Sequence, residues 1–128
     1  MQATLVTATF LTAVCARDIA ALAACLHPLV RLRALLPDDA VVRVGPAAVA
    51  GRFGVWLGGW DDAEVLRSEM WQVAGRSAVA YRLVLRDRAG PTMELEHQLY
   101  CDVADGRLRA IDLLGVGPGH SDHAVARR

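Results

Sequence analysis

Apolar and polar side chains alternate between residues 93 and 103, and this is the clearest pattern in the chain. A period of two is typical of a strand with one buried face. His97 stands at an apolar position of the alternation, so the pattern places an imidazole on the buried face. Asp105-Gly106 follows, a pair that favours a tight hairpin turn because glycine readily adopts a positive φ. Residues 107–115 then carry enough apolar side chains for a returning strand.

Four further segments have the patterning of strands. Residues 29–36 alternate in the same way, and residues 41–44 are long enough for a short second strand. Residues 65–74 and 77–86 come before the hairpin and are separated from it, and from each other, by short connections rich in Gly and Asp. Such short connections predict that the last four strands form an antiparallel meander.

Three helices are predicted before the meander. Residues 4–14 and 19–26 have apolar side chains three and four positions apart. Asp18 stands where its carboxylate can cap the second of these helices, and Pro28 is expected to end it, since proline pushes the preceding residue out of the α region. Gly45-Pro46 opens the third helix, with proline at its first position. The apolar stripe that predicts burial of this helix against a sheet consists of Val49, Phe53, Trp56 and Leu57.

Helices followed by a long antiparallel meander define an α+β fold. At 128 residues the chain is most simply one domain with a single core. The segment after Gly115 shows no periodicity and contains the helix- and strand-breaking run Gly117-Pro118-Gly119. We therefore expect one domain over residues 1–117 and a flexible tail over residues 118–128.

Composition and charge narrow the possible partners. The 14 basic and 14 acidic side chains give a net charge of zero, which argues against nucleic-acid binding, because that function needs clustered basic charge. No apolar run reaches the roughly 20 residues that cross a bilayer, and the N-terminus lacks the basic start of a signal peptide, so we expect a cytoplasmic protein without membrane contact. The three cysteines lack metal-ligand spacing, and no nucleotide-binding loop is present, so no metal or cofactor is expected.

Three short stretches, and the order of the predicted elements, resemble the nuclear transport factor 2-like superfamily, particularly its SnoaL-like branch. They are Arg-Asp-Ile-Ala-Ala-Leu at 17–22, Val-Gly-Pro-Ala-Ala-Val at 44–49 and Asp-Val-Ala-Asp-Gly-Arg-Leu-Arg-Ala-Ile-Asp-Leu at 102–113. The resemblance covers residues 3–117. It implies a cone-shaped, strongly curved, mostly antiparallel sheet wrapped around a buried helix, with N-terminal helices closing an apolar pocket. It also implies a homodimer formed through the outer face of the sheet.

The SnoaL-like branch includes ketosteroid isomerases, polyketide cyclases and dehydratases, and also members without catalytic activity. In its enzymes a His, Asp or Tyr in a dry pocket abstracts a proton beside a carbonyl group. The resemblance makes His97 the catalytic proton acceptor and Asp112 its orienter or the complementary acid. The alternatives are a hydrogen-bonded core histidine and a structural ion pair. Leu29 departs from the family pattern, since relatives often carry an acidic residue at this place after a His-Pro pair.

Aromatic and apolar side chains are candidates for lining the pocket. Trp71 is expected to face the ligand, because its strand should cross the mouth of the cavity, although core packing is the usual role of a tryptophan. Tyr100 has the opposite parity to His97, which favours a place in the dimer interface over one in the pocket. The predicted ligand-binding residues are Phe53, Trp56, Trp71, Leu95, Leu99 and Tyr100.

Two functions of different classes fit these residues. The first is a cofactor-independent enzyme that acts by acid–base chemistry on a small apolar cyclic molecule held in an internal pocket, by cyclisation, isomerisation, dehydration or epoxide opening. The second is a non-catalytic module of the same fold that binds a hydrophobic ligand or serves for dimerisation. Fold alone does not separate them, since one fold hosts many functions.

Overall fold

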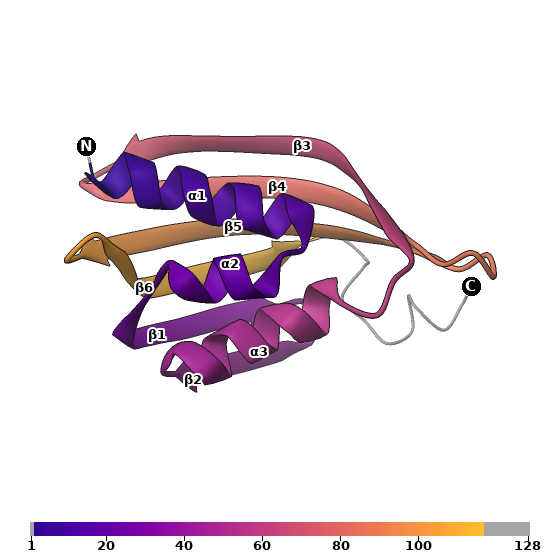
Figure 1. The fold of residues 1–128 in the computed structure, drawn as a ribbon, viewed down its shortest axis with the longest axis horizontal. Helices are drawn as coiled ribbons and strands as arrows, with labels where there is room; N and C mark the ends of the chain where they lie inside the picture. Colours follow the sequence, from indigo (N-terminus) through magenta and orange to yellow (C-terminus); the bar gives the residue numbers. More distant parts are fainter. Residues whose placement is uncertain (1, 117–128) are drawn as a thin grey trace.

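The computed structural model describes residues 2–116, which form three helices and a sheet of six strands (Figure 1). The predicted tail over residues 118–128 lies outside the described residues. Within the described part of the chain, no helix is long and apolar enough to cross a membrane. In chain order the elements are α1 (Gln2–Ala16), α2 (Ile19–Ala24), β1 (Leu26–Leu36), β2 (Asp39–Val44), α3 (Pro46–Leu57), β3 (Asp62–Val73), β4 (Arg76–Arg86), β5 (Thr92–Ala104) and β6 (Arg107–Val116).

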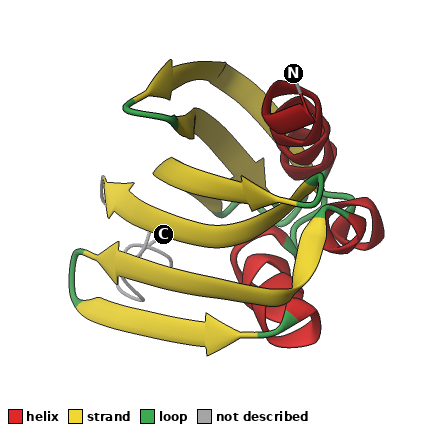
Figure 2. Ribbon diagram, turned by 90° about the vertical axis from the view of Figure 1, so that its left-hand side faces the viewer, coloured by secondary structure: helices red, strands yellow, loops and turns green. Residues whose placement is uncertain are grey.

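The six strands form one sheet in the order β2-β1-β6-β5-β4-β3. Neighbouring strands are antiparallel, except that β1 and β6, the first and last strands of residues 2–116, run parallel. The sheet is curved, and the three helices lie against one of its faces, which we call the inner face (Figure 2). The predicted α+β fold, with a curved and mostly antiparallel sheet and a meander from β3 to β6, is confirmed.

The boundary between α2 and β1 differs from the prediction. The helix ends at Ala24 and Cys25 caps it, whereas Pro28 lies inside the following strand. The pairing of β1 with β6 shifts between Leu26 and Arg31. Proline has no N–H to donate to a ladder, so it is tolerated at such an irregularity. Pro28 therefore interrupts the sheet instead of ending the helix.

The predicted cap and turn signals are present. Asp18 accepts a hydrogen bond of 3.0 Å from the backbone N–H of Ala21, at the start of α2. Pro46 occupies the first turn of α3. Asp105 and Gly106 have φ values of 54° and 72°, so both residues of the turn between β5 and β6 are left-handed, which glycine adopts without strain.

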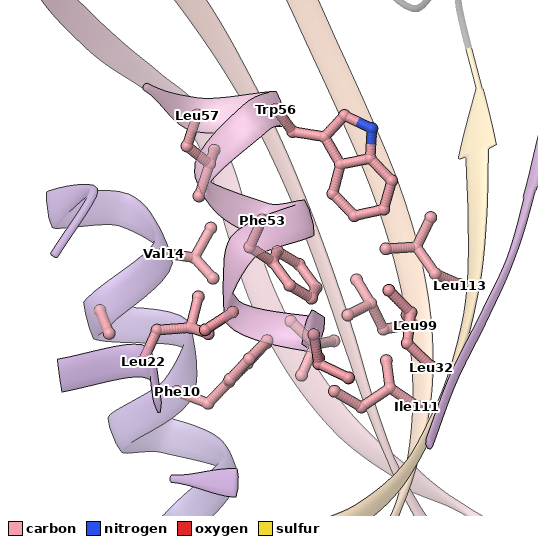
Figure 3. Close-up of a cluster of buried hydrophobic side chains, with 14 of the residues drawn as sticks. Phe10, Val14, Leu22, Leu32, Phe53, Trp56, Leu57, Leu99, Ile111 and Leu113 are labelled. Atoms are coloured by element: carbon pink, nitrogen blue, oxygen red, sulfur yellow. The ribbon is translucent and has the colours of Figure 1, made fainter. Parts of the chain in front are cut away.

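The hydrophobic core lies between the helices and the inner face (Figure 3). Phe10 of α1 meets Phe53 of α3 edge to face, with ring centroids 5.6 Å apart. Phe53 meets Trp56 in the same way, at 5.1 Å. Burying one such side chain contributes about 1.5–3 kcal/mol, so the stripe of α3 is a main source of stability. The strands oppose it with Leu32, Leu99, Ile111 and Leu113, among others.

Candidate functional site

His97 and Tyr81 form a polar pair in the interior of the protein. They lie directly opposite each other on β5 and β4, and their side chains point to the inner face. Their relative exposures are 0% and 1%. The Tyr81 hydroxyl oxygen is 2.6 Å from Nδ1 of His97, a short hydrogen bond in a low-dielectric setting. The pair is thus a direct hydrogen bond between two fully buried side chains.

The surroundings of Tyr81 keep its hydroxyl protonated. Burial raises the pKa of Tyr81 well above its usual value of 10.0, and the thiols of Cys101 and Cys15 raise it further. Burial in turn raises the pKa of the Cys101 thiol to about 12. Neither group is therefore ionised at neutral pH, and Tyr81 faces His97 as a neutral phenol.

Trp56 also contacts the imidazole of His97. Its ring centroid is 4.8 Å from that of His97, at an interplanar angle of 68°. Trp56 comes from the last turn of α3 and is 5% exposed. The imidazole thus contacts both an indole from a helix and a phenol from a strand, and the aromatic contacts continue from Trp56 to Phe53 and Phe10.

Asp112 lies on the opposite face of the sheet from His97. On β6 the partner of His97 is Gly115, and the partner of Asp112 is Tyr100. Because side chains alternate along a strand, positions three residues apart point to opposite faces. The prediction that Asp112 orients or complements His97 is therefore wrong, and no contact between them is possible through the sheet.

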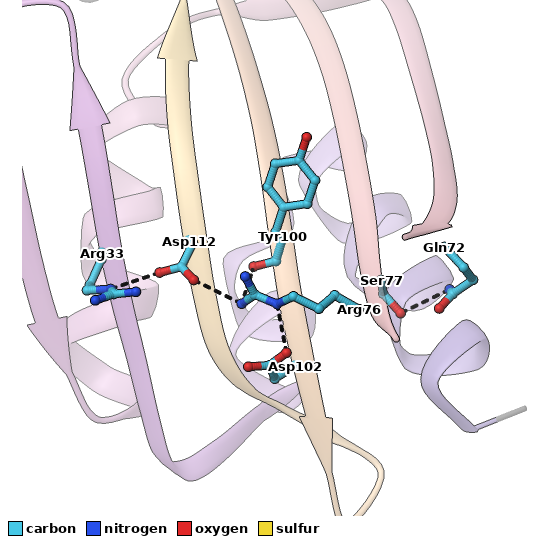
Figure 4. A network of polar contacts seen from close by, with 7 residues as sticks. All are labelled: Arg33, Gln72, Arg76, Ser77, Tyr100, Asp102 and Asp112. Atoms are coloured by element: carbon cyan, nitrogen blue, oxygen red, sulfur yellow. Dashed lines mark hydrogen bonds and ion pairs between the residues drawn. The ribbon is translucent and has the colours of Figure 1, made fainter. Parts of the chain in front are cut away.

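Asp112 belongs instead to an ionic network on the outer face (Figure 4). Its carboxylate accepts hydrogen bonds of 2.9 Å from Arg33 and from Arg76, and Arg76 also binds Asp102 at 2.8 Å. Burial of Asp112 raises its pKa, but the hydrogen bonds and charges of the two arginines outweigh this and hold the pKa below its usual value of 3.8. Asp112 thus remains ionised and paired, which is the structural ion pair that the sequence left open.

The predicted ligand-binding residues divide between the two faces. Phe53, Trp56, Leu95 and Leu99 are buried on the inner side, together with His97. Tyr100 lies on the outer face, as its parity predicted. Trp71 is also on the outer face, because it pairs with Ala78, the neighbour of Tyr100 on β4.

A β-bulge explains why the expectation for Trp71 is wrong. The pairing of β3 with β4 shifts between Val65 and Arg67. A bulge inserts one extra residue and reverses the alternation beyond it. Val65 pairs with Leu83 and points inward, but the residues that point inward after the bulge are Ser68, Met70 and Gln72 rather than Arg67 and Trp71.

Tyr81 was missed by the sequence analysis. It stands in an alternating run with Val79, Leu83 and Leu85, and this period of two could have placed it on the buried face of the strand. Its distance from His97 depends on the register of β4 against β5, which fixes the opposite residue. Periodicity alone does not supply that register.

The outer face carries a separate apolar groove of about 440 Å³. It lies over β2, β1 and β6 and does not include His97. Several of its apolar side chains are exposed, at 62% for Leu35, 58% for Val42 and 44% for Leu114. The groove is lined by Arg33, Ala34, Leu35, Ala40, Val41, Val42, Tyr100, Asp112, Leu113 and Leu114.

Neither a protein-family model nor a curated protein sequence matches the chain. Solved structures do match. An NTF2-like protein of unknown function from Burkholderia pseudomallei K96243 superposes with a TM-score of 0.70 at 15% identity, covering 100% of this chain and 99% of that one. A candidate ketosteroid isomerase from Kribbella flavida DSM 17836 has a TM-score of 0.67 at 20% identity, covering 94% of this chain and 82% of that one. A candidate polyketide cyclase from Xanthomonas campestris pv. campestris has a TM-score of 0.67 at 19% identity, with 88% and 89% covered.

These similarities extend over nearly the whole chain, and the topology agrees with them. The protein therefore has the cone fold of the nuclear transport factor 2-like proteins, as its sequence resemblance implied. At identities of 20% or less the likeness concerns the fold, and the function must be argued from the site.

Proposed function

We propose that the protein is a small-molecule enzyme that transfers a proton with His97 and Tyr81 on an apolar, cyclic, carbonyl-containing substrate. The observation that carries the proposal is the hydrogen bond of 2.6 Å between Tyr81 and His97, both buried in an otherwise apolar interior. A titratable pair in a dry site is the arrangement that acid–base enzymes use, because low dielectric strengthens each interaction with the reacting atoms.

The proposed step balances without a net gain or loss of protons. His97 is neutral at the start, with the proton on Nδ1 donated to the Tyr81 oxygen. Nε2 removes a proton from the carbon beside the substrate carbonyl, which leaves an imidazolium and an enolate. The imidazolium then returns that proton to another atom of the enolate. Tyr81 remains a neutral phenol throughout and holds the imidazole in place.

The structural neighbours support this substrate class. The Kribbella flavida protein is a candidate ketosteroid isomerase and the Xanthomonas campestris protein is a candidate polyketide cyclase. Both names refer to carbonyl compounds with ring systems. The apolar side chains around His97, namely Trp56, Leu95 and Leu99, suit such a ring system better than a polar substrate.

Exchange of α-protons tests the proposal without knowledge of the natural substrate. The protein is incubated in deuterated water with a panel of flat cyclic ketones, and loss of each α-proton signal is followed by NMR. We expect catalysed exchange of at least one ketone, and its loss in His97→Asn, which keeps a hydrogen-bonding group toward Tyr81 and removes Nε2. Val55→Ala, a change at an exposed position of α3, serves as the control. Undiminished exchange in His97→Asn would exclude this role.

The second candidate function is that of a non-catalytic ligand-binding module. It is favoured by the scarcity of polar groups in the interior and by the lack of a buried carboxylate in the described part of the chain. The buried polar or charged residues there are Thr7, His27, Ser77 and His97. Ketones that bind in calorimetry but do not exchange their α-protons would favour this function over the enzyme.

We further propose that a second copy of the chain covers the outer face of the sheet. The exposed apolar groove needs a partner surface, and the ionic groups in and beside it are already paired within the chain, as in Arg33–Asp112 at 2.9 Å and Arg76–Asp102 at 2.8 Å. Such internally neutral pairs can be covered by an identical surface without leaving an unpaired charge. The expectation of a homodimer from the sequence resemblance agrees with this proposal.

Light scattering after size exclusion tests the dimer. We expect a mass twice that of the 13.8 kDa chain, and a monomer for Leu35→Asp, which places a charge in the groove. Val55→Asp is the matched control, because Val55 is similarly exposed, at 67% against 62%, but lies on α3. A monomeric wild-type chain at high micromolar concentration, or a dimeric Leu35→Asp variant, would rule the interface out.

A further inference from the structure

Arg52 is an arginine whose charge has no acidic partner in residues 2–116. It lies on α3, one turn before Trp56, and its Cζ is 5.0 Å from the centroid of the Trp56 ring. Its Nε is buried and makes no hydrogen bond. Leaving a charged donor desolvated and unsatisfied is costly, so such a group needs an explanation.

Other partly buried arginines of the described chain are used within the fold. Arg17 donates to the carbonyl oxygens of Leu57 and Trp60, at 3.1 and 3.0 Å, and so holds the C-terminal end of α3. Arg76 and Arg82 are bound to carboxylates on the outer face. A structural role of this kind does not account for Arg52, whose guanidinium lies over the Trp56 indole.

The position of Arg52 relates it to the buried pair. The Trp56 ring contacts both the guanidinium of Arg52 and the imidazole of His97. Trp56 therefore connects the charged group to the buried pair. A ligand whose ring system lies beside Trp56 and reaches His97 can therefore present its other end to Arg52. A planar guanidinium stacked on an aromatic ring is a common arrangement for binding a carboxylate in two hydrogen bonds.

We propose that Arg52 binds an anionic group of the substrate, so that the protein prefers apolar ring compounds bearing a carboxylate over neutral ones. This inference rests on the proposed function, since it assigns the substrate class of the same site. His97 acts on the ring end of the ligand, and Arg52 fixes the opposite, charged end. Arg52 is a specificity residue in this arrangement.

A pair of ligands of nearly equal shape tests the proposal. 2-Naphthoic acid carries a carboxylate where 2-acetylnaphthalene carries a neutral methyl ketone. We expect calorimetry at low salt to give an affinity about tenfold higher for the acid, the factor that corresponds to about 1.4 kcal/mol. Arg52→Met keeps the apolar stem against Trp56 and removes the charge, so it should lower the affinity for the acid about tenfold and leave the ketone unchanged. Arg52→Lys should retain part of the preference.

The matched control is Arg109→Met, a loss of the same charge at an exposed position of β6. Wild-type protein that binds acid and ketone equally would overturn the role of Arg52 and leave the proposed function standing. If Arg52→Met still prefers the acid, the proposed role of Arg52 is also overturned. If Arg52→Met loses affinity equally for the acid and the ketone, Arg52 only supports the Trp56 ring, and the proposed role is again overturned. Binding of neither ligand would instead contradict the interior ligand site on which the proposed function depends.

Discussion

The Tyr81 hydroxyl and Nδ1 of His97 lie 2.6 Å apart on directly opposed positions of two neighbouring strands. Because both side chains are buried, neither can replace this hydrogen bond with one to bulk water. The pair therefore matters for stability as well as for chemistry.

Removing the hydroxyl alone should destabilise the protein. For Tyr81→Phe we expect a loss of about 1–3 kcal/mol in the free energy of unfolding, the usual cost of leaving a buried polar atom, here Nδ1 of His97, without its hydrogen-bond partner. Urea unfolding followed by circular dichroism measures this. Tyr100→Phe is the matched control, since it removes the same group from the outer face, where the hydroxyl accepts a hydrogen bond of 2.8 Å from Gln98, and it should cost less. Equal losses in the two variants would argue against a special role of the buried pair.

The ionic network around Asp112 should make stability depend on acid pH. The pKa of Asp112 is lowered in the folded protein, so its contribution is fully present above the unfolded value near 3.8 and is lost as the pH falls through the lower folded value. We expect Asp112→Asn to be less stable than the wild type at neutral pH. The difference should shrink below about pH 4. Denaturant unfolding between pH 2 and 7 measures it.

Asp38→Asn is the control for this titration, because Asp38 is an exposed turn residue without an ion pair among residues 2–116. Its difference from the wild type should stay small over the same pH range. A gap between Asp112→Asn and wild type that stays constant down to pH 2 would contradict the lowered pKa of Asp112.

The cysteines should be unreactive in the native protein. Burial raises the pKa of Cys15 and Cys25, and that of Cys101 to about 12, so few thiolates are present at pH 8. We expect slow labelling by iodoacetamide in native buffer and labelling of all three thiols in guanidinium chloride, counted by mass spectrometry. Cys15, which is half-buried, should react first. Rapid native labelling of Cys101 would show that the interior opens readily.

Replacing Gly75 and Gly51 by alanine should change the stability of the protein in opposite directions. Gly75, at a φ of 81°, lies in the turn between β3 and β4, and an added Cβ meets open space, so Gly75→Ala should cost about 1 kcal/mol through backbone strain alone. Gly51 lies inside α3, is exposed and also has open space around a Cβ. Gly51→Ala should therefore stabilise by up to about 1 kcal/mol. Thermal melting of both variants compares them.

Elements whose side chains alternate regularly could be predicted from the sequence, and residues that depend on register could not. The strand of His97 and the Asp105-Gly106 turn follow from local patterns, because period and turn chemistry are properties of neighbouring residues. The face of Trp71 depends on a bulge near Val65, for which a single sequence has no clear signal.

The candidate site was only half predictable for the same reason. His97 could be singled out because it occupies an apolar position of an alternating strand pattern, whereas its contact with Tyr81 is set by the pairing of β5 with β4. Asp112 was placed with His97 by resemblance to a family, and the register of β6 against β5 puts it on the other face. A carboxylate between two apolar residues indicates burial or pairing but does not say on which face it lies.

The central position of β6 has a consequence for the order of events during synthesis. β6 is the last strand of the described residues, yet it joins β1 to β5. Until β6 leaves the ribosome, the nascent polypeptide contains a hairpin of β1 and β2 and a separate unit of β3, β4 and β5. The strand that pairs with both units is still missing. Contacts between the two ends of a chain form late and slow folding. Copies in which β6 has not yet been made should therefore expose two unpaired strand edges and depend on chaperones until that strand has emerged.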